Sequence, residues 1–292
     1  MLATLPYETM TFLPYYVARE MKFFKNEGVD LDYVYTLSGG ARGGKRKTVD
    51  LCVSGDAPFF TSVSTAIEAR LLGWADVKAL AASNTRGSSM FARPTIQTVA
   101  DLRGKRVMTG GGASRNEMLY LAQLNGWEIG RDLVLVRGDE VARAKAFADP
   151  KIDAVCGRIL YKTYADQYGF HVFHLPGAVW HDGGLCTSGQ MIERQPDAVQ
   201  AVVNGFVRAM AFIRENKAEA VKIGARNIRW LDEAAVASHY DNTEFTPDIT
   251  EEGLRWMVGL LQVAKQSDRL ATPSDMADLG FLRRAGEQHW RR

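Results

Sequence analysis

The chain has 292 residues, long enough for two globular lobes, and its composition of 46% hydrophobic and 24% charged residues is ordinary for a soluble protein. Its 36 basic and 34 acidic side chains nearly cancel to a formal charge of +2. This balance argues against nucleic acid as the main partner, because phosphate binding needs a clustered basic surface. The densest basic run, residues 42–47, is short and typical of a solvated turn. No apolar run approaches the roughly 18 residues that a membrane-spanning helix needs.

The alternation of strand-like and helix-like segments in the first half of the chain is typical of an α/β protein with largely parallel sheets. Helices are expected after Thr9 or Thr11, with Pro14 in the first turn, and from Asp56 or Pro58 onward. The apolar pattern predicts strands at residues 2–7, 29–36, 49–53, 77–82, 105–109, 133–136, 154–156 and 171–173.

The second half of the chain becomes mostly helical after Gly189. An apolar stripe with helical spacing predicts a long amphipathic helix around residues 199–210. Further helices are expected at residues 218–225, 233–240 and 251–264.

The order of these segments predicts two lobes. Crossovers are expected near residues 88–93 and 184–190, so lobe I takes residues 1–88 and 186–292 and lobe II takes residues 89–185. Two connecting segments of this kind form a hinge, and ligands bind where the carboxyl ends of the strands face a cleft.

The start of the sequence does not resemble a signal peptide, because residues 2–7 form only a short apolar run without a basic n-region or a small-residue cleavage site. We therefore expect either a cytosolic protein or one whose leader is absent from this sequence. The three cysteines, Cys52, Cys156 and Cys186, cannot all pair and form no C-x-x-C motif, so they do not decide the compartment.

Several motifs, in the same order along the chain, resemble the NMT1/THI5-like family. Residues 12–20 (FLPYYVARE) and 23–31 (FFKNEGVDL) resemble the opening helix of that family and the strand after it. The later matches are VDLCVS at 49–54, TVADLRGKRV at 98–107 and DAV at 153–155. The resemblance covers about residues 1–225. The family includes the nitrate-, sulfonate- and taurine-type binding components of ABC importers.

This resemblance implies a type II periplasmic-binding-protein fold, with two α/β lobes joined by a two-segment hinge. It implies a monomeric solute-binding protein in the periplasm that delivers a small ligand to a membrane permease, with no cofactor and no catalytic activity. The family also contains enzymes, such as pyrimidine-precursor synthases, whose His- and Cys-rich iron motif is missing from this sequence. Two alternatives stay open: an enzyme on the same fold acting on a small aromatic or pyrimidine-like substrate (a decarboxylase or precursor synthase), and a cytosolic ligand-sensing module.

The sharpest local feature is the glycine run at residues 110–112, followed by Ser114, Arg115 and Glu117. Ser114 and Glu117 have the spacing of a capping box, which predicts a helix that starts at Ser114 and offers its free N–H groups to an anion. Gly112, Ser114 and Arg115 are therefore candidate ligand contacts, although a plain capped helix explains the same pattern. Residues 39–46 and 110–115 approximate a P-loop and a dinucleotide fingerprint but lack required residues of each, so neither nucleotide site is expected.

Residues that follow the predicted strands are the other candidate ligand contacts: Tyr7, Glu8, Thr9, Ser38, Gly39, Ser54, Gly55, Asp56, Asn84, Arg137 and Arg158. Arg158 is the best candidate to hold a carboxylate, sulfonate or phosphate, because its guanidinium can bind two oxygens; the alternative is a surface pair with Asp153 or Asp166. Glu8 either binds an amine or caps the first helix.

Tyr7, Phe12 and Trp180 either stack on a planar ligand or belong to the core. The spacing of His171 and His174 sends their side chains to opposite faces of a strand, and no Ser-His-Asp or Cys-His arrangement appears. We therefore expect no metal site and no catalytic residues. The arginines and aromatic side chains among the candidates predict a small organic ligand, either an anion such as a carboxylate or sulfonate or a nitrogen heterocycle.

Overall fold

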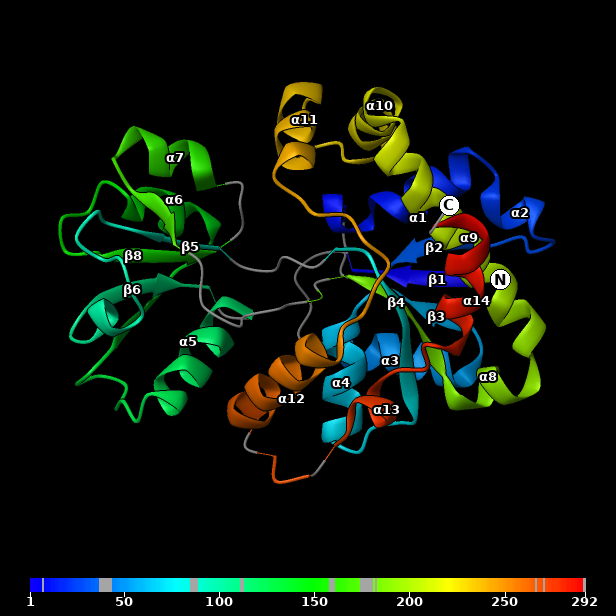
Figure 1. Ribbon diagram of the computed structural model, residues 1–292, viewed down its shortest axis with the longest axis horizontal. Coiled ribbons are helices and arrows are strands. Elements are labelled where there is room, and N and C mark those ends of the chain that lie inside the picture. The colour runs from blue at the N-terminus through cyan, green and yellow to red at the C-terminus, as the bar shows by residue number, and fades with distance from the viewer. Residues whose placement is uncertain are drawn as a thin grey trace. The chain divides into compact units, whose positions relative to one another are not determined.

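The computed structural model describes residues 1–6, 8–36, 44–84, 89–110, 113–157, 161–173, 181, 183–265, 267–269 and 271–290. The chain divides into two compact units (Figure 1). Unit 1 comprises residues 1–85, 181–255 and 269–292, and unit 2 comprises residues 86–180 and 256–268. Each unit is built around its own five-stranded sheet. None of the described helices is long and apolar enough to span a membrane.

The sheet of unit 1 has the strand order β2-β1-β3-β10-β4. Its strands are β1 (Leu2–Leu5), β2 (Asp32–Tyr35), β3 (Phe59–Phe60), β4 (Val77–Ala82) and β10 (Gly184–Ser188). Strand β1 pairs in parallel with β2 and β3, whereas β10 runs antiparallel between β3 and β4. The carboxyl ends of β1, β3 and β4 and the amino end of β10 therefore meet at one edge of the sheet.

The helices of unit 1 pack around this sheet, and α9 (Pro196–Glu215) is the longest of them. The predicted stripe is confirmed, because Val199, Val203, Phe206 and Met210 are fully buried on one face of α9. Phe206 meets Tyr15 of α1 edge to face, at 5.3 Å between ring centroids. The others are η1 (Met10–Phe12), α1 (Leu13–Glu20), α2 (Phe23–Asn26), α3 (Gly44–Ser54), α4 (Val63–Leu71), α8 (Gly189–Arg194), α10 (Lys217–Asn227), α11 (Glu233–Asp241), α13 (Pro273–Met276) and α14 (Gly280–His289).

The sheet of unit 2 has the order β7-β6-β8-β5-β9. Its elements are β5 (Ser89–Ala92), η2 (Ala100–Leu102), β6 (Arg106–Thr109), α5 (Ala113–Leu124), β7 (Val134–Arg137), α6 (Glu140–Ala146), β8 (Ala154–Gly157), α7 (Lys162–Gln167) and β9 (His171–Phe173). Neighbouring residues of β6 point into different cores: Val107 packs in the cluster with Met118 and Leu121 of α5, and Met108 packs in the cluster with Phe147 and Tyr161. Helices therefore cover both faces of this sheet.

Helix α12 (Glu251–Lys265) begins in unit 1, and its residues from Trp256 onward belong to unit 2. Trp256 packs edge to face on Tyr120 of α5, with ring centroids 4.9 Å apart. Gly259 lets Tyr120 approach, since a Cβ there would lie 2.5 Å from the Tyr120 hydroxyl. Residues 256–268 were predicted in lobe I, but this aromatic contact holds them in unit 2.

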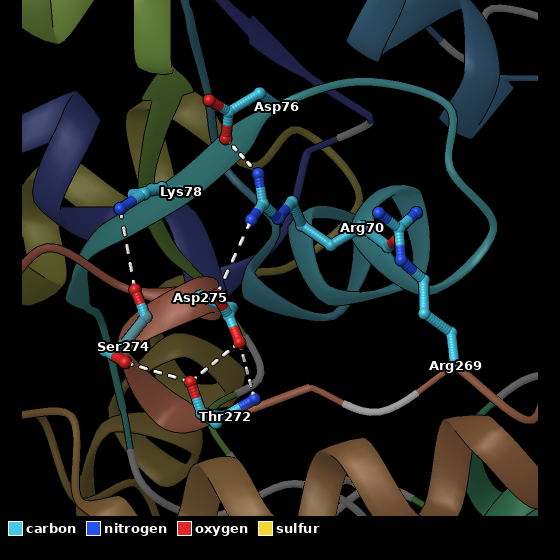
Figure 2. Close-up of polar contacts among 7 residues, drawn as sticks. All are labelled: Arg70, Asp76, Lys78, Arg269, Thr272, Ser274 and Asp275. Carbon is cyan, nitrogen blue, oxygen red and sulfur yellow. Dashed lines mark hydrogen bonds and ion pairs between the residues drawn. The ribbon is translucent and has the colours of Figure 1, made fainter.

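The chain re-enters unit 1 at Arg269 and is fastened by a polar network (Figure 2). Arg269 donates to the carbonyl of Arg70 at 3.0 Å, and Arg70 pairs with Asp76 and, at 4.0 Å, with Asp275. Asp275 also accepts from the backbone N–H of Thr272 at 2.8 Å. These contacts hold the chain before α13 against α4 and β4.

Residues 49–53 were predicted to be a strand, and this prediction is wrong because they lie in α3. Val49 and Cys52, three residues apart, are buried while Asp50 and Val53 are exposed, which is the spacing of a helix face rather than of a strand. The third strand is instead the buried pair Phe59–Phe60, which had been assigned to the next helix.

That next helix, α4, begins after Ser62 and not at Asp56 or Pro58. The Ser62 hydroxyl accepts from the backbone N–H of Thr65 at 3.2 Å, so Ser62 is its N-cap. Replacing Ser62 by alanine is expected to lower the free energy of unfolding by about 1 kcal/mol. Urea unfolding checks this, with Ser238→Ala as the control, because Ser238 is exposed in the middle of α11, a helix that Asp232 caps. Equal losses in the two variants would contradict the assignment.

Both predicted crossovers contain strands. Residues 88–93 include β5, and residues 184–190 include β10, so the expected boundary after residue 185 lies inside a strand of unit 1. The chain passes between the units at residues 85/86, 180/181, 255/256 and 268/269, which is two more passages than the predicted hinge has.

Candidate functional site

The carboxyl ends of three parallel strands in unit 2 form one edge of its sheet. Strand β6 lies between β7 and β8, and its last residue Thr109 is in register with Arg137, the last residue of β7. Gly157 ends β8. In open α/β sheets, ligands bind outside this end of the strands. We call this part of unit 2 the cationic edge, together with the side chains of Arg115, Arg137 and Arg143.

The guanidinium of Arg143 lies beside two of these strand ends. A Cβ on Gly110 would lie 3.3 Å from Cζ of Arg143, and a Cβ on Gly157 would lie 3.2 Å from one of its terminal nitrogens. Glycine at both positions therefore lets the guanidinium approach the backbone closely. The group also lies over the ring of Tyr161, at 5.1 Å from the centroid, and its Nε–H is 3.4 Å from the carbonyl oxygen of Asp139.

Helix α6 positions Arg143 because it starts directly behind the end of β7. The Asp139 carboxylate accepts from the backbone N–H of Ala142 at 2.8 Å and so caps the helix. Gly138 permits the tight entry, since a Cβ there would lie 2.8 Å from Cβ of Ala142. Arg143 thus reaches the strand ends from the first turns of a capped helix.

Two predicted residues lie at the same edge. Arg115 is in the first turn of α5 and half-buried, and Arg137 is exposed at the end of β7. In the described part of the chain, neither they nor Arg143 forms an ion pair; the carboxylates paired in unit 2 bind Arg103, Arg131 and Lys162. Uncompensated guanidinium groups beside the N-terminus of a helix favour an anion.

The predicted capping box at Ser114 is wrong, because α5 begins one residue earlier, at Ala113. The Ser114 hydroxyl instead accepts from the backbone N–H of Gly110 at 3.0 Å. Glu117 is buried, and the Cys156 thiol of β8 donates to it at 3.6 Å. Close by in the chain, the buried Thr109 hydroxyl has no hydrogen-bond partner among the described residues.

The corresponding edge of unit 1 carries uncharged polar groups. The Thr61 hydroxyl donates to the carbonyl of Thr4 at 3.2 Å. The Ser83 hydroxyl and the Asn84 side-chain oxygen are buried and have no partner within the described residues. Gly183 packs closely on Ser83, since a Cβ there would lie 2.4 Å from the Ser83 hydroxyl oxygen. The predicted residue Asn84 is therefore at a strand end, as its position after β4 indicates.

Charged residues near this edge are paired with each other. The Glu8 carboxylate accepts from Nε of Arg229 at 2.9 Å and from its backbone N–H at 3.1 Å, and it does not cap α1. These hydrogen bonds from Arg229 lower the pKa of Glu8. Lys45 pairs with the buried Glu68 at 2.7 Å. Arg229 and Lys45 thus have carboxylate partners, unlike the three arginines of unit 2.

Several predicted contacts are not at a strand end. Phe12 is 5% exposed and belongs to the core of unit 1, so its core interpretation holds, and Thr9 is buried as well. Ser54, Gly55 and Asp56 are exposed at the end of α3, where Gly55 has a φ of +86°, because the strand expected before them is a helix. Tyr7, Ser38, Gly39, Gly112, Arg158 and Trp180 lie outside the described residues.

The cysteine side chains are not accessible for thiol chemistry. Cys52, Cys156 and Cys186 are all buried and free. Burial raises the pKa of Cys52 to about 12 and raises the pKa of the other two thiols well above the ordinary value. None of them is a thiolate at neutral pH. Among the described residues, no group of three His, Cys, Asp or Glu side chains could hold a metal ion.

Comparison with known proteins gives a family and a fold. A family model described as NMT1/THI5 like matches residues 9–220. The putative periplasmic sulfonate-binding protein SsuA of Methylobacillus flagellatus superposes with a TM-score of 0.77 at 16% identity, over 98% of this chain and 93% of that one.

The aliphatic sulphonate binding protein SsuA of Escherichia coli superposes with a TM-score of 0.72 at 16% identity, over 95% of this chain and 91% of that one. The desulfurization enzyme DSZB superposes with a TM-score of 0.61 at 16% identity, over 99% of both chains. No curated protein matches significantly. The fold is the type II periplasmic-binding-protein fold, with two α/β lobes, as the sequence predicts.

Proposed function

Since the chain belongs to the NMT1/THI5-like family, we propose that it is the solute-binding protein of an ABC importer and captures a small organic anion by closure of its two units. Its proposed place is the periplasm, and its proposed partner is a membrane permease. The two SsuA proteins of similar fold, whose names state periplasmic sulfonate binding, support this role.

The main support for an anionic ligand is the cationic edge of unit 2. Arg143 lies against two glycines at the ends of β6 and β8, and neither it, Arg115 nor Arg137 pairs with a carboxylate in the described part of the chain. Such groups gain most from a ligand that brings the missing negative charge, because charge-assisted hydrogen bonds are stronger than neutral ones. Carboxylates, sulfonates and phosphonates all meet this requirement.

The uncharged edge of unit 1 supports a ligand whose other end is neutral. Ser83 and Asn84 offer a hydroxyl and an amide, while Glu8 and Lys45 are already paired. In this proposal the anionic group binds at the cationic edge of unit 2, and the neutral part of the molecule is held by hydrogen bonds and apolar contacts.

A second candidate function is an enzyme on the same fold, and the similarity to the desulfurization enzyme DSZB favours it. Against it, the three thiols are buried and protonated at neutral pH, so they supply no nucleophile. The two functions differ in the fate of the bound molecule: a binding protein returns it unchanged.

Calorimetric titration with matched compounds tests the proposal. The panel pairs alkyl and aryl sulfonates, carboxylates and phosphonates with the neutral methyl sulfone or ester of the same size. At least one anion is expected to bind about 100-fold more tightly than its neutral partner, and to be recovered unchanged after prolonged incubation. Binding that ignores charge, or conversion of the bound compound, would contradict the proposal.

A further inference from the structure

The chain passes from one unit to the other at four places. Near three of them, the adjoining segments of unit 1 meet around the side chain of His181. These three passages are at residues 85/86, 180/181 and 255/256, and His181 itself is the first residue of unit 1 after the second of them. Its side chain is fully buried. A buried, polar side chain at such a place needs a structural or functional reason.

The imidazole contacts the start of α12, which leads to the third passage. Its Nε2 accepts a hydrogen bond from the backbone N–H of Thr250 at 3.2 Å, directly before the helix. The Thr250 hydroxyl accepts from the N–H of Gly253 at 3.1 Å. Gly253 allows the ring to lie against the first turn, since a Cβ there would be 2.5 Å from Nε2. His181 and Thr250 thus satisfy N–H groups that a helix start leaves without partners.

The neighbouring segments are tied to each other by backbone hydrogen bonds. The N–H of Ala82 donates to the carbonyl of Pro247 at 2.9 Å, and the N–H of Ser83 donates to the carbonyl of Gly183 at 3.1 Å. A hydrogen bond with the backbone of Asn84, which lies next to the first passage, raises the pKa of the imidazole. The end of β4, the start of β10 and the start of α12 therefore form one corner of unit 1, with His181 inside it.

We propose that His181 is a positioning residue of the hinge: its neutral ring, protonated on Nδ1, holds the first turn of α12 to the other two passages. Because a neutral imidazole has one donor and one acceptor nitrogen, acceptance at Nε2 fixes the proton on Nδ1. Loss of this acceptor loosens the start of α12 and, if the proposed function holds, weakens capture of an anion.

Acid is expected to release the same contact. Burial lowers the pKa of His181 from 6.5 to about 4, so the ring is neutral at neutral pH, and protonation near pH 4 removes the acceptor. On the described segments around the ring, the charged group that interacts with it is the Asp248 carboxylate, whose negative charge raises the pKa of His181 and so opposes the effect of burial. Glu251 and Glu252 of α12 are exposed.

Nuclear magnetic resonance of the imidazole nitrogens tests the assignment directly in the full chain. Nε2 is expected to be unprotonated at pH 7, and the ring is expected to titrate near pH 4, well below an exposed histidine. A proton on Nε2 at pH 7, or an ordinary titration near pH 6.5, would overturn the proposal. This readout needs neither a variant nor a ligand.

Two substitutions test the consequence. His181→Leu removes the acceptor, whereas His181→Gln keeps one and is expected to restore it. Hydrogen exchange at Thr250, Gly253 and Leu254, corrected for intrinsic rates, is expected to be about tenfold faster in the leucine variant, and near wild type in the glutamine variant. Equal exchange in both variants and wild type would overturn the proposal.

The anion that binds tightest in the calorimetric panel then serves as the probe for capture. The leucine variant is expected to bind it about tenfold more weakly than the glutamine variant, and unchanged affinity counts against the role in the hinge. If no anion binds wild type, the proposed function fails, while the tautomer and exchange results still decide whether His181 holds α12.

Discussion

Replacing Arg143 by glutamine lowers the affinity for a small organic anion by about 10- to 100-fold, because a hydrogen bond to a charged group contributes about 1.5–3 kcal/mol. Arg143 lies beside Gly110 and Gly157 at the cationic edge, and in the described part of the chain it forms no ion pair with a carboxylate. Glutamine keeps a polar side chain over Tyr161, so the fold is expected to persist. Isothermal titration with the tightest-binding anion measures the change.

Arg106 provides the matched control for Arg143. It is exposed and begins β6, the strand whose other end leads to Gly110. Arg106→Gln removes the same charge from the same sheet at its opposite edge, so it is expected to leave affinity within about twofold at physiological salt. Equal losses in the two variants would show that only the total charge matters, and the assignment of the site would fail.

Replacing Gly184 by alanine lowers the free energy of unfolding of unit 1 by about 3 kcal/mol. Gly184 starts β10, and a Cβ there would lie 2.1 Å from the carbonyl oxygen of Ala81 and 2.8 Å from a methyl of Val63. The first of these atoms is backbone of the neighbouring strand β4, which cannot turn away as a side chain can. The added methyl must therefore push β4 away from β10.

Urea unfolding followed by circular dichroism measures this loss, and Gly280→Ala is the control. Gly280 begins α14, and the atom nearest to an added Cβ is a carboxylate oxygen of Asp278 at 3.2 Å, at the end of a side chain that can move. The control variant is expected to be neutral or slightly stabilised, because alanine favours helix over glycine. A Gly184 variant as stable as wild type would mean that β10 does not lie between β3 and β4.

Strong local patterns made much of the fold predictable. The strand at 77–82 has its predicted bounds, and the stripe on α9 is buried, because both segments combine a clear period with a single apolar face. The segment VDLCV at 49–53 misled the prediction because its β-branched and apolar residues favour a strand, whereas the helix buries only Val49 and Cys52 of them. Strand β10 gave no local signal, since its antiparallel place depends on where the chain returns from unit 2.

The candidate site was predictable only where a residue directly follows a strand. That rule led to Arg137 and Asn84, which do lie at strand ends, and the glycine run led to Arg115, which lies in the first turn of α5. Arg143 was missed because it lies inside α6, whose charged sequence EVARAKA is typical of a solvated surface helix. Which face of that helix meets the strand ends depends on its packing and on the room left by Gly110 and Gly157, and neither can be read from the sequence.

Native mass spectrometry of the protein purified without added ligand tests most directly whether Arg143 holds a small organic acid. Wild type is expected to carry a small molecule that denaturation releases and that ionises as an anion, and the Arg143→Gln variant is expected to carry much less of it than the Arg106→Gln variant. A molecule that is cationic or neutral, or that stays bound equally to all three proteins, would contradict the account.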